Sequence, residues 1–392
     1  MIKKNSFSKH SIYLKLLAFY FVLLVFGTLN IGTIGSLLKI FAFLPAFWWL
    51  ITKNTIGFSR PLVAAMFFLG FSTISLFWSI DVYSTLVGDI GLISLLILLC
   101  ASSGYKYSAE NILFLKKALI WSSRITALAV LFIGGTLEYR FTLTDVLKED
   151  PNYLNAYFLF GVVNAIECIL SPIKYYRQIV YLLELGVYLL LVFASGSRGG
   201  AVAIIFAIFI SGLGSFLRNK ISIKTLFVPM LLGILVFLLV FIVPYILPQE
   251  VLQRFYMQNI IESKGTGRYQ LWQDYWNVFI TSPFWRQLIG YGKSVTFSLA
   301  RDALFVRINV AHNILIEHLV SVGIIGLFLY FVMIWQFIKA AFLRHNIFAL
   351  SVLGGVLMLS MSTSFGGKVY WNILIFIICL TNLSQPVIKE NK

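Results

Sequence analysis

Long apolar runs recur along this chain and restrict the folds that it can adopt. A helix needs roughly 20 apolar residues to cross a bilayer core. About twelve runs approach this length, at 14–29, 33–51, 61–78, 86–102, 116–135, 153–170, 177–194, 200–217, 225–247, 311–338, 342–362 and 369–385. Of the 392 residues, 59% are hydrophobic and only 12% are charged, which excludes an ordinary soluble domain. We therefore expect an all-α integral membrane protein with about 12 transmembrane helices, forming a single polytopic domain over residues 1–392.

The positive charge of the chain sets its orientation in the membrane. A net charge of +16 would suggest nucleic acid in a soluble protein, but basic residues in membrane proteins collect in short cytoplasmic loops. They precede the first run and return in every second connection, at Lys3, Lys4, Lys9 and Lys15, then Lys53 and Arg60, Lys106 and Lys116, Lys174 and Arg177, Arg218, Lys220 and Lys224, and Lys339 and Arg344. This alternation predicts a multi-pass protein of the plasma or inner membrane with both termini in the cytoplasm. It excludes nucleic acid as a partner.

The one long connection, residues 248–310, must then be a large extracytoplasmic loop. Within it, aromatic and aliphatic residues at 269, 272, 275, 276 and 279 fit one face of an amphipathic helix. We expect this helix to lie along the outer membrane surface. Ser282 and Pro283 end it, and Gly290-Tyr291-Gly292 reads as a turn.

Metal and thiol chemistry find no support in the sequence. The three cysteines lie inside apolar runs, at Cys100, Cys168 and Cys379, where neither a disulfide framework nor a thiolate site is expected. The outward side shows no cluster of carboxylates or histidines suited to Mg²⁺, Mn²⁺ or Zn²⁺. We therefore expect no metal and no cofactor.

A polar break between two apolar runs, Ser197-Arg198-Gly199, is the first candidate site. Glycine lets backbone amides approach a ligand, a helix begins there with its positive dipole end, and a guanidinium binds phosphate with two hydrogen bonds. Ordinary placement of an arginine at the membrane interface explains Arg198 equally well. A nucleotide-binding phosphate loop is excluded, because no Gly-Lys-Ser/Thr ending is present.

Arg268 is the second candidate, at the start of the expected surface helix. A solvated charge at a helix end would explain it. Its functional interpretation is a second clamp on the same anion, because a diphosphate carries more charge than one arginine neutralises.

His312-Asn313 is the third candidate, at the outer end of an apolar run. At 100° per residue His312, Gly323 and Gly326 fall within about 40° of one direction, so we expect the histidine to face the bundle beside small residues. Histidine is the usual general base near neutral pH. A hydrogen-bonded structural histidine is the alternative, and Glu317 and His318 are weaker candidates on the same helix.

Asp150 and Asn152 form the fourth candidate, with Pro151 between them at the outer start of a run. A carboxylate and an amide at this position are explained by helix capping. They are also suited to bind sugar hydroxyls or to orient His312.

Taken together, these motifs resemble the O-antigen ligase and polymerase family. The resemblance rests on Ser197-Arg198-Gly199, on Arg268 and Trp272 with the following Pro283, Gly290 and Gly292, and on His312-Asn313 with Gly323 and Gly326. Residues 76–81, Leu-Phe-Trp-Ser-Ile-Asp, also resemble a recurrent element of that family. The order and spacing of these motifs cover most of the chain.

The resemblance implies a metal-independent membrane glycosyltransferase of GT-C-like architecture that acts on a glycan carried by undecaprenyl diphosphate. In this interpretation His312 accepts the proton of the acceptor hydroxyl, while Arg198 and Arg268 bind the departing diphosphate. Asn313, Ser197, Gly199, Asp150 and Asn152 support the site. Undecaprenyl-diphosphate-linked glycan serves as donor and acceptor in surrounding membrane lipid, and a chain-length regulator and a flippase are expected as further partners.

We favour a polymerase of capsular or O-antigen-type repeat units over a ligase. A ligase transfers the glycan to a lipid A core and requires an outer membrane, whereas the many Phe, Ile, Asn and Lys residues are compatible with an AT-rich Gram-positive genome. A flippase for the same lipid-linked oligosaccharide is the alternative of another class, and a non-catalytic scaffold is a third. Transporters tend to show matching halves and interrupted helices, and the sequence shows neither.

Overall fold

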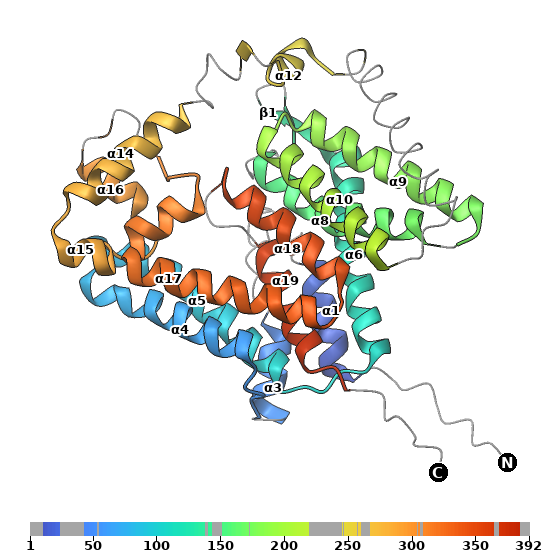
Figure 1. Cartoon of the computed structure of the whole chain (residues 1–392), viewed down its shortest axis with the longest axis horizontal. Helices are drawn as coiled ribbons and strands as arrows, with labels where there is room; N and C mark the ends of the chain where they lie inside the picture. The colour runs from blue at the N-terminus through green and yellow to red at the C-terminus, as the bar shows by residue number, and fades with distance from the viewer. Residues whose placement is uncertain are drawn as a thin grey trace.

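The fold is a bundle of helices with one small hairpin (Figure 1). The computed structural model describes residues 11–23, 43–52, 55–137, 140–142, 151–171, 173–218, 245, 247–256, 258–259, 267–303, 305, 309–363 and 368–384. Within these residues only β1 (Gly135–Leu137) and β2 (Arg140–Thr142) are strands, and they pair antiparallel. The all-α class is therefore confirmed, with this hairpin as an addition.

The helices alternate in direction along the chain. In order they are α1 (Ile12–Leu23), α3 (Leu44–Thr52), α4 (Arg60–Ile74) with the 3₁₀ turn η2 (Ser75–Trp78), α5 (Val82–Ser103), α6 (Ala109–Ile133), α8 (Pro151–Leu170), α9 (Tyr175–Ala194), α10 (Arg198–Arg218), α12 (Gln249–Gln253), α14 (Arg268–Thr281), α15 (Phe284–Ile289), α16 (Thr296–Asp302), α17 (Ile314–Leu343), α18 (Ile347–Ser360) and α19 (Lys368–Thr381). Short connections join most of the long ones, so antiparallel neighbours result.

Six of the described helices are long and apolar enough to cross a membrane: α4 with η2, α5, α8, α9, α10 and α17. Three shorter apolar helices, α1, α18 and α19, accompany them. Of the expected run at 33–51 the structure describes only 43–51, and of the run at 225–247 only residues 245 and 247. Membrane spanning is thus supported, and the count of twelve stays a prediction.

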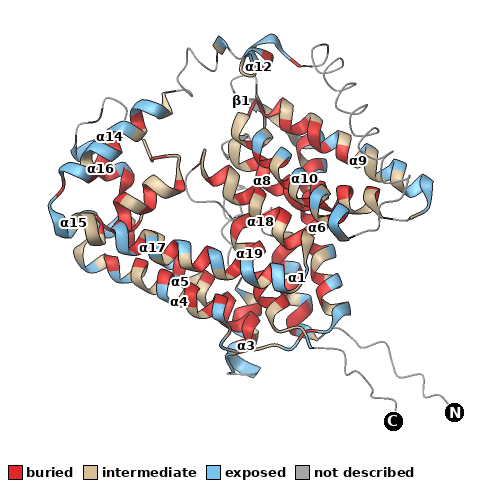
Figure 2. Ribbon diagram, in the orientation of Figure 1, coloured by how far each residue is buried: buried red, intermediate tan, exposed pale blue. Residues whose placement is uncertain are grey.

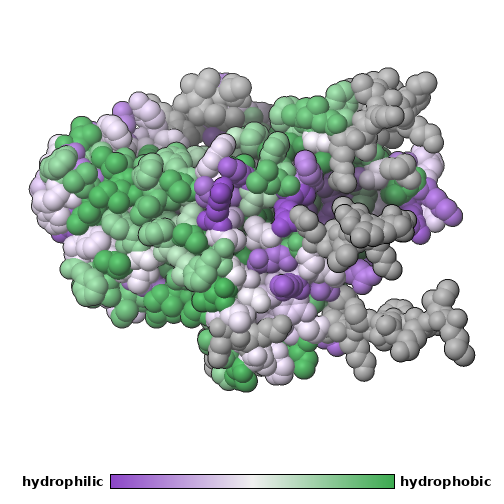
Figure 3. Space-filling view, turned by 60° about the horizontal axis from the view of Figure 1, so that its bottom comes forward, coloured by the Kyte–Doolittle hydropathy of each residue, from purple (hydrophilic) through white to green (hydrophobic). Residues whose placement is uncertain are grey.

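The core of the bundle includes α19 and α8, whose side chains are mostly apolar and are buried on nearly every face; Figure 2 shows this burial. From Val369 to Leu380 only Trp371 is more than slightly exposed. Helices that are hydrophobic all round belong in such interior positions. The outer surface is also apolar, and Figure 3 shows it on the side built by α4, α5 and α17, where Phe67, Phe328 and Trp335 are exposed. An apolar core and an apolar outer surface on this side are both compatible with a lipid environment.

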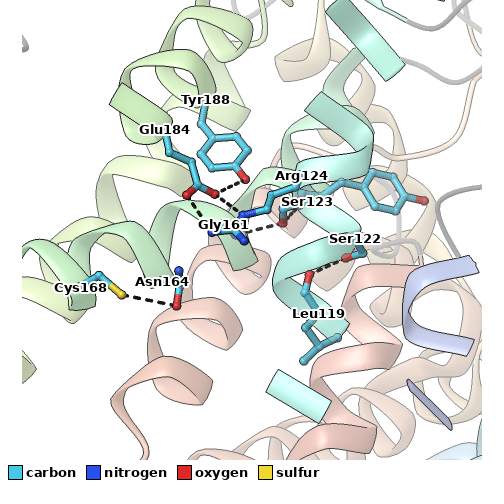
Figure 4. A network of polar contacts seen from close by, with 10 residues as sticks. Leu119, Ser122, Ser123, Arg124, Gly161, Asn164, Cys168, Glu184 and Tyr188 are labelled. Atoms are coloured by element: carbon cyan, nitrogen blue, oxygen red, sulfur yellow. Dashed lines mark hydrogen bonds and ion pairs between the residues drawn. The ribbon is translucent and has the colours of Figure 1, made fainter. Parts of the chain in front are cut away.

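Arg124 and Glu184 form an ion pair inside the bundle (Figure 4). Arg124 of α6 donates from Nε and Nη2 to the two carboxylate oxygens of Glu184 in α9, at 2.9 and 3.0 Å. Tyr188 donates to the same carboxylate at 2.9 Å, and a Cβ at Gly161 would collide with the ring of Tyr188. Ionisable groups at membrane depth are costly unless paired. This network therefore joins α6, α8 and α9 as a structural unit.

Helix α17 is not continuous, which corrects the sequence prediction for 311–338. Gly323 has φ +68° and ψ −172°, a conformation open essentially only to glycine. The break separates an upper arm, residues 314–322, from the long lower part of α17. The common face assigned to His312, Gly323 and Gly326 was derived for an unbroken helix and is wrong. The sequence showed no interrupted helix, whereas α17 is interrupted at Gly323.

The break is where the end of α15 crosses α17. Tyr291 and Gly292 donate their backbone N–H groups to the carbonyls of Val320 and Ser321, at 3.0 and 2.9 Å. A Cβ at Gly290 would collide with the backbone of Ser321, and one at Gly323 with the backbone of Leu288. Two glycines thus allow two backbones to touch.

Replacing Gly323 with alanine should destabilise the protein. The added Cβ meets the Leu288 carbonyl, and the positive φ alone costs about 1–3 kcal/mol for a residue with a side chain. Gly212→Ala is the matched control, since open space surrounds Gly212 in α10 and alanine favours a helix. In thermal unfolding of the detergent-solubilised protein, Gly323→Ala should melt clearly lower and Gly212→Ala at or above the native temperature. Equal melting of the two variants would contradict the crossing.

Candidate functional site

His312 lies directly before α17, in a left-handed backbone conformation with φ +49°. Its side chain is half-buried. Histidine enters this region more readily than most residues, but a positive φ still costs free energy and persists only where the surroundings enforce it. The contacts on both sides of His312 show what enforces it.

Two side chains of α14 hold the chain just before His312. The indole Nε1 of Trp272 donates to the carbonyl of Ala311 at 2.8 Å. The hydroxyl of Tyr275 lies 2.6 Å from the carbonyl of Asn309 and 2.7 Å from that of Thr296, and its single proton serves one of them at a time. The Arg-x-x-x-Trp motif and the Ala-His-Asn motif are therefore in direct contact through Trp272.

Asn313 fixes the chain just after His312. Its Oδ1 accepts the backbone N–H groups of Leu315 and Ile316, at 3.0 and 3.3 Å, so it is the N-cap of α17. Its Nδ2 donates to the carbonyl of Met361 at 3.2 Å, which ties the cap to the end of α18. Asn313 thus connects the start of α17 to the end of α18, and its role in supporting a site stays a prediction.

The Ser197-Arg198-Gly199 motif reaches the same turn from the other side. Ser197 is buried and its hydroxyl accepts the N–H of Gly200 at 3.1 Å, capping α10. A Cβ at Gly199 would collide with Ser362, the residue after Met361. Three motifs that are far apart in the sequence therefore meet around residues 311–313 and 361–362.

Arg198 is paired with an arginine that the sequence analysis missed. Its Nε donates to the carbonyl of Arg254 at 2.5 Å, and the Nε of Arg254 donates to the carbonyl of Gly196 at 3.0 Å. Within the described part of the chain neither guanidinium forms an ion pair. Two positive groups are thus held together by backbone carbonyls. No local pattern marks Arg254, because it follows the short helix α12 in an irregular segment.

Arg268 opens α14, after Gly267 with φ +77°. One turn separates it from Trp272, so both lie on the same helix face, the face directed at Ala311. Figure 1 shows α14, which begins with Arg268, and α10, which begins with Arg198, in separate parts of the molecule. The joint action of Arg198 and Arg268 on one anion stays a prediction.

The single apolar face expected for this helix is only partly correct. Tyr275 and Phe279 are buried together with Leu271, but Tyr269 and Trp276 are exposed. The buried face packs against the upper arm of α17 and the connection before it, so packing within the protein selects it. Its expected position along the membrane surface is untested.

The fourth candidate pair is only half described. Asn152 lies half-buried in the first turn of α8, whereas Asp150 lies outside the described residues.

No group of three or more His, Cys, Asp or Glu side chains with metal-binding geometry occurs in the part of the chain that the structure covers.

Residues 76–81 fasten the long loop to the bundle. Trp78 donates from Nε1 to the carbonyl of Ile289 at 3.1 Å, and Arg286 donates to the carbonyl of Trp78 at 2.8 Å. Asp81 caps α5 through Ser84 and also accepts the hydroxyl of Ser298 in α16. These hydrogen bonds, that of Ser298 first, lower the pKa of Asp81 to about 2.

The low pKa of Asp81 predicts an acid-sensitive contribution to stability. Because the pKa of Asp81 is lower in the folded than in the unfolded protein, its ionised carboxylate stabilises the fold at pH values above the unfolded pKa of about 3.9. This stabilisation is lost as the pH falls through the folded-state pKa. Asp81→Asn should therefore lower the melting temperature at pH 7, and the difference from the native protein should shrink between about pH 4 and pH 2. Asp302→Asn, at an exposed site in the same loop, is the control and should change little. If the difference in melting temperature between Asp81→Asn and the native protein does not change with pH, the hydrogen bonds of the Asp81 carboxylate do not have the role given to them.

Comparison with known proteins gives one family match. A family model described as O-antigen ligase matches residues 185–331, a segment that contains Arg198, Arg254, Arg268 and His312. No curated protein matches. A solved chain from a study of polymerization and crosslinking by a peptidoglycan synthase complex is similar, with 16% sequence identity, a TM-score of 0.43, and 84% of this chain and 96% of that chain covered. A likeness of that degree transfers neither fold nor activity. The match over residues 185–331 is consistent with the resemblance to the O-antigen ligase and polymerase family seen in the motifs.

Proposed function

We propose that this protein is a membrane glycosyltransferase that joins lipid-linked oligosaccharide repeat units into a surface polysaccharide. The match of residues 185–331 to the family model described as O-antigen ligase supports an activity of the O-antigen ligase or polymerase type. The observation that carries the proposal is the meeting of three motifs at His312: Trp272 holds Ala311, Asn313 holds Met361, and Gly199 packs on Ser362. A base and a set of arginines on helix ends are what this transfer needs.

The proposed reaction is a displacement at the anomeric carbon of the donor sugar. The hydroxyl oxygen of the acceptor forms the new glycosidic bond while the bond between the anomeric carbon and the diphosphate oxygen breaks. The leaving diphosphate takes the bonding electron pair, and His312 takes the proton of the acceptor hydroxyl. One displacement of this kind inverts the configuration at the anomeric carbon.

Arginines replace a metal ion in this proposal. Arg198 and Arg254 are oriented by their Nε hydrogen bonds, which leaves the terminal nitrogens to meet phosphate oxygens. Arg268 approaches from α14 and adds a third positive charge. Preorganised cations that neutralise a developing charge are usually the largest single contribution to such a barrier.

The membrane arrangement belongs to the same proposal. We place the site on the outer face of the plasma or inner membrane, with both termini in the cytoplasm and about twelve spans in a GT-C-like bundle. The undecaprenyl diphosphate donor would then approach through the lipid, with its diphosphate at the level of the helix ends. Asn313, Ser197 and Asp81 each cap the start of a helix.

Ligation to another acceptor is the second candidate, because the matching family model is described as O-antigen ligase. The chemistry is the same and only the acceptor differs. The interrupted helix α17 does not favour a flippase, because among the described helices it is the only one with an internal break, so no matching pair of broken helices is seen.

Purified protein incubated with a lipid-linked repeat unit tests the function. Products longer than one repeat unit support a polymerase. Transfer only to an added second acceptor, such as a lipid A core, supports a ligase. If no glycosidic bond forms with either acceptor while a folded protein is present, the proposal is wrong.

His312→Ala should lower turnover by about 10²-fold or more, since positioned general bases contribute about 10²–10⁴-fold. The matched control is His345→Ala. His345 has nearly the same backbone conformation, φ +47°, but lies in the turn between α17 and α18, at the far end of the bundle. The control variant should keep its turnover and show a similar change in melting temperature. Full activity of His312→Ala would remove the histidine from the mechanism.

Arg198→Lys and Arg254→Lys should each lower activity about tenfold or more although the positive charge is kept. Lysine lacks the Nε donor that orients each side chain and cannot bind phosphate through two nitrogens at once. Arg301→Lys, at an exposed position in α16, serves as the control. Initial rates over a range of donor concentrations measure the effect, and unchanged kcat and KM in both site variants would exclude the arginine pair from donor binding.

A further inference from the structure

Four ionisable side chains are buried where α5, the α15–α16 connection and the upper arm of α17 come together, and they have no part in the proposed reaction. Their exposed fractions are 2% for Asp89, 4% for Lys293, 7% for Glu317 and 0% for His318. They come from α5, from the connection between α15 and α16, and from the upper arm of α17. Because transfer of a charged side chain out of water is costly, buried ionisable residues in a membrane bundle are candidates for a functional role.

Backbone hydrogen bonds and close packing hold Lys293 against η2 and α5. Its N–H donates to the hydroxyl of Ser75 at 2.9 Å, and its carbonyl accepts the hydroxyl of Thr85 at 2.7 Å. The next residue, Ser294, has φ +64°, and a Cβ at Gly88 would collide with its side chain. Asp89 follows Thr85 by one helical turn and therefore lies on the same face of α5.

The other side of the same connection is joined to the upper arm of α17. Tyr291 and Gly292 bond to the carbonyls of Val320 and Ser321. Glu317 precedes Ser321 by one helical turn, so their side chains lie on one face of the arm, and the charge of Glu317 acts on Lys293. Lys293 thus lies between a carboxylate of α5 and a carboxylate of the arm.

The charges of these groups fit this arrangement. Burial lowers the pKa of Lys293, while the carboxylates of Glu317 and Asp89 raise it. Both carboxylate oxygens of Asp89 and Oε2 of Glu317 are buried and accept no hydrogen bond from the described residues. Because both carboxylates act by charge on Lys293, we assign its ammonium the positive charge that compensates theirs. His318 packs edge-on against Phe68 and Tyr330 on the apolar side of the arm.

We propose that Lys293 is a positioning residue whose buried charge couples Asp89 of α5 to Glu317 of the upper arm and so fixes the arm that begins at His312. Because α17 is interrupted at Gly323, the orientation of the arm depends on its contacts with other elements, and the contact with Lys293 is one of them. The kinetic consequence rests on the proposed function of His312. The coupling itself does not.

Thermal unfolding of three variants of the full chain tests the coupling. Lys293→Met leaves two buried carboxylates without compensation and should lower the melting temperature most. Glu317→Gln alone should lower it less, because Asp89 still balances Lys293. The double variant Lys293→Met/Glu317→Gln should melt higher than Lys293→Met, since one uncompensated charge is gone. Additive losses in the two single variants would overturn the coupling.

The kinetics of the double variant test positioning. A displacement of about 1 Å at a reacting group costs on the order of 10²-fold in rate, so its kcat should fall by about 10²-fold relative to the native protein, with the KM for the lipid-linked donor unchanged within about twofold. Arg124→Gln/Glu184→Gln is the matched control, because it removes a bidentate ion pair between α6 and α9. That control should keep kcat per folded molecule.

The outcomes separate the two proposals. Native kcat in the folded Lys293→Met/Glu317→Gln variant overturns the positioning role even if His312→Ala is inactive. Full activity of His312→Ala overturns the proposed function, and the unfolding cycle then still decides whether Lys293 couples the arm to α5. The positioning role is also overturned if the Arg124→Gln/Glu184→Gln control loses as much kcat as the Lys293→Met/Glu317→Gln variant. In that case the loss of any buried ion pair would lower kcat.

Discussion

The contact between the backbones at Gly290 and Gly323 is the constraint on which the candidate site depends. Side chains at either position would collide with the opposite backbone, and the conformation of Gly323 is open essentially only to glycine. Because α17 breaks there, its upper arm leaves the direction of the lower part. The arm carries Asn313 to the end of α18 and His312 to the side of α14. An unbroken helix would continue the line of the lower part and leave these contacts unmade.

The site is built from helix ends, and its polar groups also satisfy backbone groups that an apolar bundle leaves exposed. Asn313, Ser197 and Asp81 each cap a helix and each lie at a junction with another element. Uncapped N–H groups are costly where water is excluded. A replacement at such a position therefore removes a cap and a contact together. For this reason stability and turnover must be measured on the same variants.

Local signals in the sequence were sufficient for the membrane class and for most helix starts. Apolar runs predicted the long helices, and Ser197 and Asn313 were predicted at the junctions where the structure has their caps. Three features required tertiary structure. Gly323 within an apolar run reads as a small packing residue, and Arg254 and Lys293 read as solvated charges of a polar loop. The break, the arginine pair and the burial of Lys293 arise from segments remote in sequence.

The two kinds of arginine in this structure differ in what balances their charge. Arg124 is neutralised by the carboxylate of Glu184, so it needs no ligand. Arg198 and Arg254 are oriented by carbonyl oxygens, which accept hydrogen bonds but carry no full negative charge, and the two guanidiniums repel one another. A bound diphosphate would remove that repulsion and add charge-assisted hydrogen bonds. Such a pair favours an anion with two or more charges, and it strengthens its hold as the leaving group becomes more negative during glycosyl transfer.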